Sequence, residues 1–307
     1  MTISRHMSTS RRREWSGRTQ GGNWGQKFLI ALLGKMSIGG MYFLLDVALP
    51  FYIPFNHRAF KATEDYFRKR LGYSSGESFR KAYATHRKFG QMMFDRFRLY
   101  TKGDSEYHIE VDGTDGIRER MDGGEGFVIA GSHVGSMEMA GYMLGLKDKP
   151  INAVVYGGET ESLQQHRAAI MKDHGVRLVP VTDDLSHIFI IKDALDKGEI
   201  VSMASDRRLG SDKYVECQFL GAPARFPIGA FILAAQTDKE LVALFNMKEG
   251  KTGYKVYVKP ITVDRTGLGA RKIATELLKG YVSELEKIVL KYPDQWFNFY
   301  DFWKLDA

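Results

Sequence analysis

Residues 126–138 read Gly-Phe-Val-Ile-Ala-Gly-Ser-His-Val-Gly-Ser-Met-Glu. An apolar run ends at Ala130, a Gly-Ser turn follows, and a helix is expected to begin near Ser136, whose hydroxyl can cap it. This order of strand, tight turn and helix puts His133 just beyond the carboxyl end of a strand. Glu138 falls in the first turn of the helix, where the helix dipole favours a carboxylate.

The same alternation continues outward from this stretch, from about residue 106 to the end of the chain. Short β-rich runs alternate with helical patterns, which predicts an α/β fold with a mainly parallel central sheet flanked by helices. The expected strands are Tyr107–Val111, Phe127–Ala130, Ile151–Tyr156, Arg177–Pro180, Ile200–Ala204, Leu241–Phe245 and Tyr254–Val258. The expected helices lie near 114–122, 136–146, 160–174, 184–197, 227–237 and 268–291. In such folds chemistry gathers in the loops beyond the carboxyl ends of the strands.

His133 and Glu138 are the candidate catalytic pair. An imidazole can take a proton from a hydroxyl or amine, and a carboxylate can orient it and stabilise the imidazolium. The pair therefore fits attack by a hydroxyl or amine on an acyl carbonyl. The structural alternative is a loop histidine beside a helix-capping glutamate, but the small residues around His133 would admit a substrate. The segment lacks the Gly-x-Ser-x-Gly pattern of a hydrolase and the His-Glu-x-x-His spacing of a metal site.

Candidate binding residues come from a second strand end, at residues 202–210. Asp206, Arg207 and Arg208 would lie beside the first loop in a parallel sheet, and arginines can bind a phosphate or carboxylate. Ser132 of the first loop is expected to join them in substrate binding. A charged turn without a ligand is the alternative for the two arginines.

Two later segments complete the set. Residues 223–230, with Arg225, are expected to open an apolar helix that could shape an acyl pocket or merely pack. The aromatic tail at residues 292–303 alternates in a way that predicts a late strand or an extended arm. Its aromatic side chains could contact lipid, but buried packing at an edge is the expected role.

The charge of the chain is unevenly distributed. Residues 1–100 hold 18 Lys and Arg against 6 Asp and Glu, a net charge of +12, whereas residues 101–307 carry a net charge of −5. Inside the basic part, residues 28–55 are apolar with only Lys35 and Asp46 charged. An apolar stretch with basic flanks is typical of a segment that contacts a membrane.

The charged and helix-breaking residues in this stretch argue against a clean transmembrane span. Asp46 lies mid-run, and Pro50 and Pro54 are expected to disturb a helix. We therefore expect a helix that lies in the membrane or enters it partly, with a buried helix pair of a soluble protein as the alternative. The expected division is a membrane-associating segment at 1–55, a helical basic region at 56–100 and the α/β domain at 101–307.

Composition excludes several classes of protein. A hydrophobic content of 44% argues against disorder, and one cysteine cannot form an internal disulfide. No Cys and His residues have zinc-finger spacing, so a zinc finger is excluded. Acyl transfer by a general base needs neither a metal nor a bound cofactor, and none is expected. Aromatic and basic residues interleave within 57–100, but aromatics at helical spacing are more often core, so nucleic acid is not an expected partner.

In this order, the segments resemble the lipid A biosynthesis (lauroyl/myristoyl-type) acyltransferase family of the lysophospholipid acyltransferase superfamily. His133 and Glu138 match its His-x4-Asp/Glu motif, residues 205–210 its Pro-Asp-x-Asp-Tyr-Gly block and residues 292–296 its Pro-Glu-Gln-Tyr block. The resemblance implies a glycerolipid acyltransferase-like fold on the cytoplasmic face of a bacterial inner membrane, held peripherally or by a single anchor. It also implies an acyl carrier protein or coenzyme A thioester as the acyl donor.

The chain departs from the family pattern where the family carries cations or a second carboxylate. Residues 156–158 are Tyr-Gly-Gly in place of Tyr-Arg-Pro, Arg208 replaces an aspartate, and residues 298–303 lack the family's basic run. Fewer cations disfavour a bis-phosphorylated lipid A acceptor and favour a less anionic one, such as an amino-acid lipid, a lysolipid or a pigment-type lipid. Arg167 or Lys172 could supply a binding cation.

The sequence therefore predicts a membrane-associated acyltransferase that moves a fatty acyl chain from a thioester to a hydroxyl or amine of a lipid. Backbone N–H groups at the helix start, or an arginine of 202–210, are expected to stabilise the oxyanion. One alternative is a lipid hydrolase that uses the same histidine. The other is a non-catalytic module that binds a membrane or nucleic acid through the basic arm.

Overall fold

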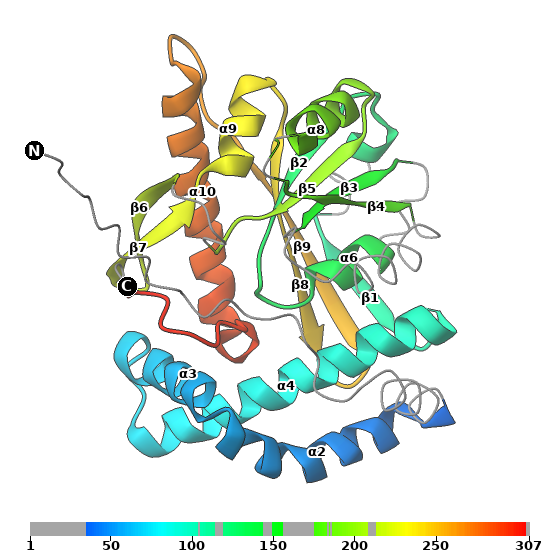
Figure 1. Ribbon diagram of the computed structural model, residues 1–307, viewed down its shortest axis with the longest axis vertical. Helices are drawn as coiled ribbons and strands as arrows, with labels where there is room; N and C mark the ends of the chain where they lie inside the picture. Colours follow the sequence, from blue (N-terminus) through cyan, green and yellow to red (C-terminus); the bar gives the residue numbers. More distant parts are fainter. Residues whose placement is uncertain are drawn as a thin grey trace, which may run out of the picture.

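The computed structural model describes residues 35–103, 105–113, 119–143, 149–155, 175–182, 184, 186–207 and 213–304. A seven-stranded sheet with the order β1-β9-β8-β2-β5-β3-β4 forms its centre (Figure 1). Its strands are β1 (His108–Asp112), β2 (Phe127–Gly131), β3 (Ile151–Val155), β4 (Val176–Pro180), β5 (Ile200–Ala204), β8 (Leu241–Glu249) and β9 (Gly253–Ile261). Only the β8–β9 pairing is antiparallel. The predicted mainly parallel α/β sheet is confirmed.

Helices cover both faces of this sheet and one of its ends. They are α2 (Ile38–Phe55), α3 (His57–Arg70), α4 (Ser75–Lys102), α6 (Met137–Met143), α8 (Ser186–Asp196), α9 (Gly229–Gln236) and α10 (Ala270–Lys291). Because side chains alternate along a strand, Val128 and Ala130 of β2 pack in the core that includes α9 and α10. Phe127 and Ile129 pack on the other face with Ala140 of α6. Burial on both faces is what a central strand of such a sheet requires.

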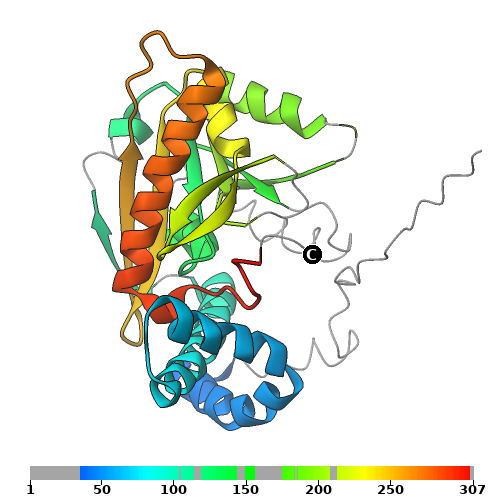
Figure 2. The same cartoon turned by 90° about the vertical axis from the view of Figure 1, so that its left-hand side faces the viewer.

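The N-terminal helices α2, α3 and α4 form a separate layer at the end of the sheet where β8 turns into β9 (Figures 1 and 2). Met41 of α2 and Met92 and Leu99 of α4 form one buried cluster with Tyr254 of β9 and Met139 of α6. The helical layer is therefore joined through its side chains to the sheet and to α6, the helix that follows His133.

The C-terminal tail packs between the helical layer and the sheet. It turns through the short 3-10 helix η1 (Pro293–Gln295) and continues as an extended arm. Trp296 is buried and makes edge-on aromatic contacts with Tyr66 of α3, with Phe219 and with Phe302. The tail is thus an arm whose aromatic residues largely pack inside the protein.

A two-stranded antiparallel hairpin, β6 (Tyr214–Phe219) and β7 (Ala222–Pro227), was not expected from the sequence. The residues expected to open a helix at 223–230 instead form β7, and α9 begins at Gly229. Leu220 and Gly221 make the turn with positive φ angles of 49° and 73°. Leucine is rare at such a position, and here its backbone N–H is held by Glu286 of α10.

Helix α2 runs without interruption through Pro50 and Pro54, contrary to the expected disturbance. Both prolines lie on its exposed side. Among the described residues, α2 is one helix long and apolar enough to cross a membrane by length and composition, and 22% of it is buried. The expected helix at 160–174 and residues 1–34 lie outside the described residues.

Candidate active site

The loop that carries His133 is fixed by one hydrogen bond within itself and by backbone hydrogen bonds to two other segments, the tail and β8. The Val134 N–H donates to the Ser132 hydroxyl (3.2 Å), Gly135 to the Gln295 carbonyl (2.8 Å) and Ser136 to the Asn246 carbonyl (2.9 Å). Gly135 has a φ of +68°, and a Cβ atom there would lie 2.1 Å from the Asn246 oxygen. Only glycine fits this position, so the loop geometry is set by the strand β8 beside it.

His133 is held by Asp206, which follows the adjacent parallel strand β5. Its Nδ1 lies 2.8 Å from Asp206 Oδ1, and its backbone N–H donates to Asp206 Oδ2 at 3.0 Å. Because an ionised carboxylate only accepts hydrogen bonds, the neutral imidazole carries its proton on Nδ1 and leaves Nε2 able to accept one. The His133 side chain is 34% exposed and Asp206 is fully buried. The pair is therefore open to a substrate only on the histidine side.

The Asp206 carboxylate stays ionised despite its burial. Burial alone would raise the pKa of Asp206, but the charge of His133, its hydrogen bonds and the charge of Arg207 outweigh this and lower the pKa to about 2. A buried acid with a strongly shifted pKa and a specific partner, next to a partly exposed histidine, is typical of a functional site. This arrangement can hold an imidazole in one tautomer and stabilise it when it takes a proton.

A further set of contacts ties the two strand ends and the tail together. The Ser205 N–H and the Tyr281 hydroxyl both donate to the Gly131 carbonyl, at 2.9 and 2.8 Å. The Arg207 guanidinium donates to the Phe297 carbonyl, while the Phe297 N–H donates to the His133 carbonyl at 3.1 Å. These bonds join the segment after β5, helix α10 and the tail to the loop or to one another, so the His133–Asp206 dyad has support from several elements.

Glu138 lies in the first turn of α6, as expected, and pairs with Arg96 of α4. From the sequence, Glu138 was expected to orient His133, and Asp206 was expected to bind substrate. In the structure Asp206 supplies the carboxylate at Nδ1. The contribution of Glu138 to catalysis stays a prediction.

Of the other residues predicted to bind substrate, Ser132 and Arg207 lie near His133, whereas Arg225 does not. The Ser132 hydroxyl is buried in the turn, and Arg207 lies beside the dyad with its guanidinium 5.8 Å from the Tyr300 ring. Arg225 lies on the β6–β7 hairpin against Tyr214 and Glu216. Arg208 and Arg167 lie outside the described residues.

Gln295, Asn246 and Tyr281 support the site but were not expected to do so. Gln295 accepts from the Lys248 N–H and donates to its carbonyl, which locks the tail to β8. The Asn246 amide donates to the Ser136 carbonyl at 3.0 Å. A lone amide in the apolar run Leu241–Met247 is a signal that could have revealed Asn246, because buried polar groups need partners.

The described residues contain no group of His, Cys, Asp and Glu side chains that could hold a metal ion. Residues 80–305, which include the loop of His133, Asp206 and the tail, match the family described as bacterial lipid A biosynthesis acyltransferase. The chain belongs to this family.

Two relatives are phosphatidylinositol mannoside acyltransferases of Mycobacterium tuberculosis, strains H37Rv and CDC 1551. Each is 27% identical over 175 residues, which cover 55% of this chain and 55% of the relative. The chain thus spans about half the length of these curated relatives. The crystal structure of the 1-acyl-sn-glycerophosphate acyltransferase PlsC from Thermotoga maritima covers 85% of this chain and 96% of its own, at 15% identity and a TM-score of 0.35.

Proposed function

We propose that this member of the family is an acyltransferase that moves a fatty acyl chain from a thioester to a hydroxyl or amine of a lipid acceptor. The observation that carries the proposal is the His133–Asp206 pair, whose geometry leaves Nε2 as a base on the open side. Family membership supports the reaction class. The predicted acceptor is less anionic than a bis-phosphorylated lipid A precursor, because the chain lacks several of the family's cations.

The reaction balances with His133 alone as the proton carrier. Nε2 takes the proton of the acceptor hydroxyl or amine while the acceptor atom attacks the thioester carbonyl carbon. The tetrahedral intermediate collapses with cleavage of the C–S bond, and the imidazolium returns the proton to the thiolate that leaves. Asp206 keeps the imidazole oriented and stabilises its positive charge throughout.

The oxyanion requires a donor other than the N–H groups of residues 133 to 136. Two alternatives were expected: N–H groups near the helix start, or an arginine after β5. The N–H groups of residues 133 to 136 each donate to acceptors within the protein. This leaves the N–H groups in the first turn of α6, from Met137 on, and an arginine after β5, for which Arg207 is the described candidate. Glu138, five residues after His133, adds a second negative charge on the same loop–helix unit.

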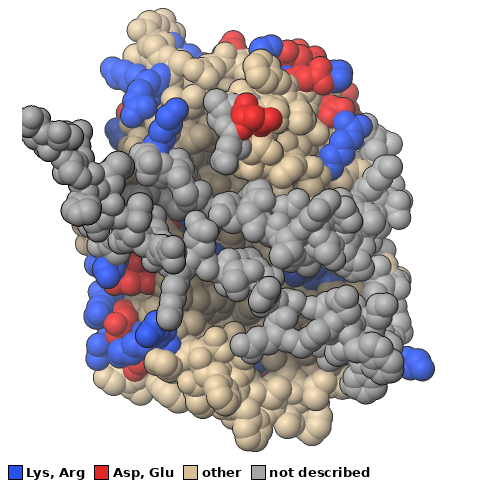
Figure 3. Space-filling model, in the orientation of Figure 1, with Lys and Arg blue, Asp and Glu red and all other residues tan. Residues whose placement is uncertain are grey.

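Helix α2 is the proposed membrane contact. Phe43, Val47, Phe51 and Phe55 are spaced four residues apart, which places them on one side of the helix, and all are exposed. Figure 3 shows an uncharged surface along the lower edge of the molecule, where α2 lies. Such an apolar stripe fits a helix lying in the interface of a bilayer. We place it at the cytoplasmic face of the inner membrane, where acyl carrier protein and coenzyme A thioesters are available.

A thioester-cleavage assay on the purified full chain tests the reaction. Acyl-coenzyme A and acyl carrier protein thioesters are offered separately, with and without extracted host lipids. Thiol release that needs lipid and yields an acylated lipid supports the proposal. Free fatty acid released at the same rate without an acceptor would instead establish a hydrolase.

A further inference from the structure

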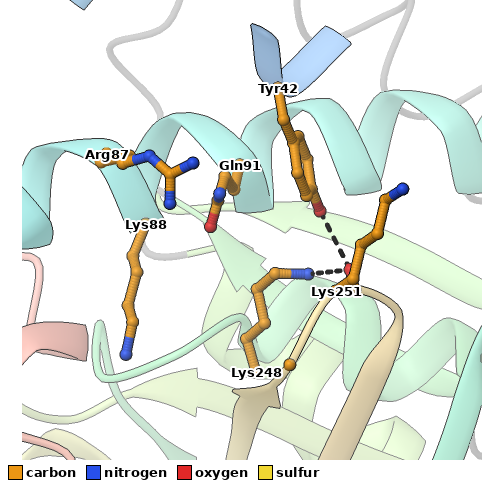
Figure 4. A pocket seen from close by; sticks show the side chains of 7 residues that line it. Tyr42, Arg87, Lys88, Gln91, Lys248 and Lys251 are labelled. Carbon is orange, nitrogen blue, oxygen red and sulfur yellow. Dashed lines mark hydrogen bonds between the residues drawn. The ribbon is translucent and has the colours of Figure 1, made fainter. Parts of the chain in front are cut away.

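A polar pocket lies between α2, α4 and the turn that joins β8 to β9. It has a volume of about 380 Å³ and is lined by Tyr42, Arg87, Lys88, Gln91, Lys248 and Lys251 (Figure 4). Four of these side chains are cations and none is a carboxylate. Neither His133 nor Asp206 lines the pocket, so it is separate from the dyad.

Three of the cations have carboxylate partners that do not line the pocket. The pairs are Arg87 with Asp46 at 2.5 Å, Lys88 with Asp294 at 2.9 Å and Lys248 with Asp95 at 2.6 Å. Within the described part of the chain, Lys251 pairs with no carboxylate, and its ammonium lies beside Gly39 in the first turn of α2. No carboxylate lines the pocket itself, and the N–H groups of Arg87 and Lys88 that Asp46 and Asp294 do not occupy, together with the Lys251 ammonium, remain as cationic donors.

Gln91 gives an independent indication of a ligand. The residue is only 7% exposed, yet its amide finds no hydrogen-bond partner among the described residues. Figure 4 shows this side chain pointing from α4 into the pocket, toward the space between Lys88 and Lys248. The amide is open to the pocket, so a polar ligand there can bond to it without displacing a partner within the protein.

We propose that this pocket binds a phosphate group. Its donors are the Gln91 amide, the Lys251 ammonium and the N–H groups of Arg87 and Lys88 that Asp46 and Asp294 do not occupy. Donors that approach from α4 and from the β8–β9 turn suit the tetrahedral oxygens of a phosphate better than a planar carboxylate. The phosphate can belong to a lipid headgroup or to a soluble ester. Tyr42 lines the pocket from α2, whose exposed stripe begins at the next residue, Phe43.

The first test titrates inorganic phosphate into the full chain in a neutral detergent, at constant ionic strength, and measures binding by calorimetry. The wild type is expected to bind in a saturable way, and Gln91→Leu and Lys251→Ala to weaken the Kd by about tenfold or more. Lys279→Ala, which removes an exposed cation on α10, is the matched control and is expected to bind like the wild type. Gln91→Leu keeps the size of the side chain and breaks no hydrogen bond within the described part of the chain, so its thermal midpoint is expected to match that of the wild type.

The second test separates the two sources of phosphate. Flotation with phosphatidylcholine vesicles, with and without phosphatidic acid, is compared for the wild type and Gln91→Leu, which have the same charge. Weaker flotation of Gln91→Leu with phosphatidic acid alone assigns a lipid headgroup, and unchanged flotation with impaired phosphate binding assigns a soluble ester. Equal phosphate affinity of wild type and Gln91→Leu, or no saturable binding, overturns the proposal. No acyl donor is present, so either result is independent of the acyl-transfer reaction.

Discussion

Asp206 accepts hydrogen bonds from His133 at both carboxylate oxygens, from the imidazole Nδ1 at 2.8 Å and from the backbone N–H at 3.0 Å. The two residues are 73 positions apart in the chain. They meet because β2 and β5 are parallel neighbours, with Gly131 opposite Ala204 at the ends from which their loops leave. One buried carboxylate therefore fixes both the path of the loop that carries His133 and the tautomer of its imidazole.

The amide variant Asp206→Asn tests the orienting role. We expect kcat for thioester cleavage to fall by about 10²- to 10⁴-fold, because an amide can donate to Nδ1 and so favour the wrong tautomer. Asp264→Asn, in an exposed turn, is the control and should keep the wild-type rate. A wild-type rate in a folded Asp206→Asn protein would remove Asp206 from the mechanism.

The same carboxylate should make stability depend on pH in the acid range. The pKa of Asp206 is about 2 in the folded chain against an ordinary value of 3.8. Because the folded value is the lower one, its contribution of roughly 2 kcal/mol is present above pH 4 and is lost as the pH falls toward 2. Denaturant unfolding from neutral to acid pH measures this. The difference in unfolding free energy between wild type and Asp206→Asn should shrink over that interval, and a constant difference would contradict the account.

The exposed stripe of α2 predicts membrane binding that can be removed without unfolding. Phe51 and Phe55 are 72% and 86% exposed, so Phe51→Ser with Phe55→Ser should cost little stability but weaken flotation with lipid vesicles. Phe189→Ser on α8 is the matched control, because Phe189 is 75% exposed and α8 lies at the opposite end of the molecule from α2 (Figure 1). Equal flotation of all three proteins would show that α2 is not the contact.

The ion pair between Asp95 and Lys248 should dominate the stability of the joint between the helical layer and the sheet. Asp95 is fully buried and also accepts from Tyr42 and Tyr254, at 2.6 and 2.5 Å. Asp95→Asn leaves a lysine that is only 2% exposed without its partner and should cost about 3–5 kcal/mol.

The double variant Asp95→Asn with Lys248→Met distinguishes a broken pair from a general packing defect. It should recover part of the lost free energy of unfolding, because no unpaired charge is then buried. Denaturant unfolding at neutral pH measures both variants. A double variant that is less stable than Asp95→Asn alone would show that the ion pair is not the main source of the cost.

Much of the sheet could be predicted because its strands are continuous apolar runs between turn signals. The β5 strand was predicted without error at Ile200–Ala204, and β2 only one residue short of its end at Gly131. The β6–β7 hairpin was missed because its turn uses Leu220 at positive φ where Asn or Gly would be expected. Tertiary contacts, here the Glu286 carboxylate on the Leu220 N–H, stabilise what local sequence disfavours.

The candidate site was predicted in its parts but not in its pairing. Strand alternation placed His133 and Asp206 at neighbouring strand ends, because carboxyl ends of parallel strands share one edge of the sheet. Spacing along the chain made Glu138 the nearest carboxylate, whereas the sheet brings Asp206 to Nδ1 across the gap between strands. Which of two nearby carboxylates orients a histidine depends on side-chain direction, and local spacing does not encode that direction.

Lipid mass spectrometry on host cells that express the wild type or His133→Ala is the most direct test of acyl transfer by His133. The account predicts a lipid one acyl chain heavier than its precursor with the wild type, and a loss of about 10²- to 10⁴-fold in its formation rate with His133→Ala. Both proteins must be present at equal amounts in folded form. The same acylated lipid formed at the same rate with His133→Ala would contradict the account.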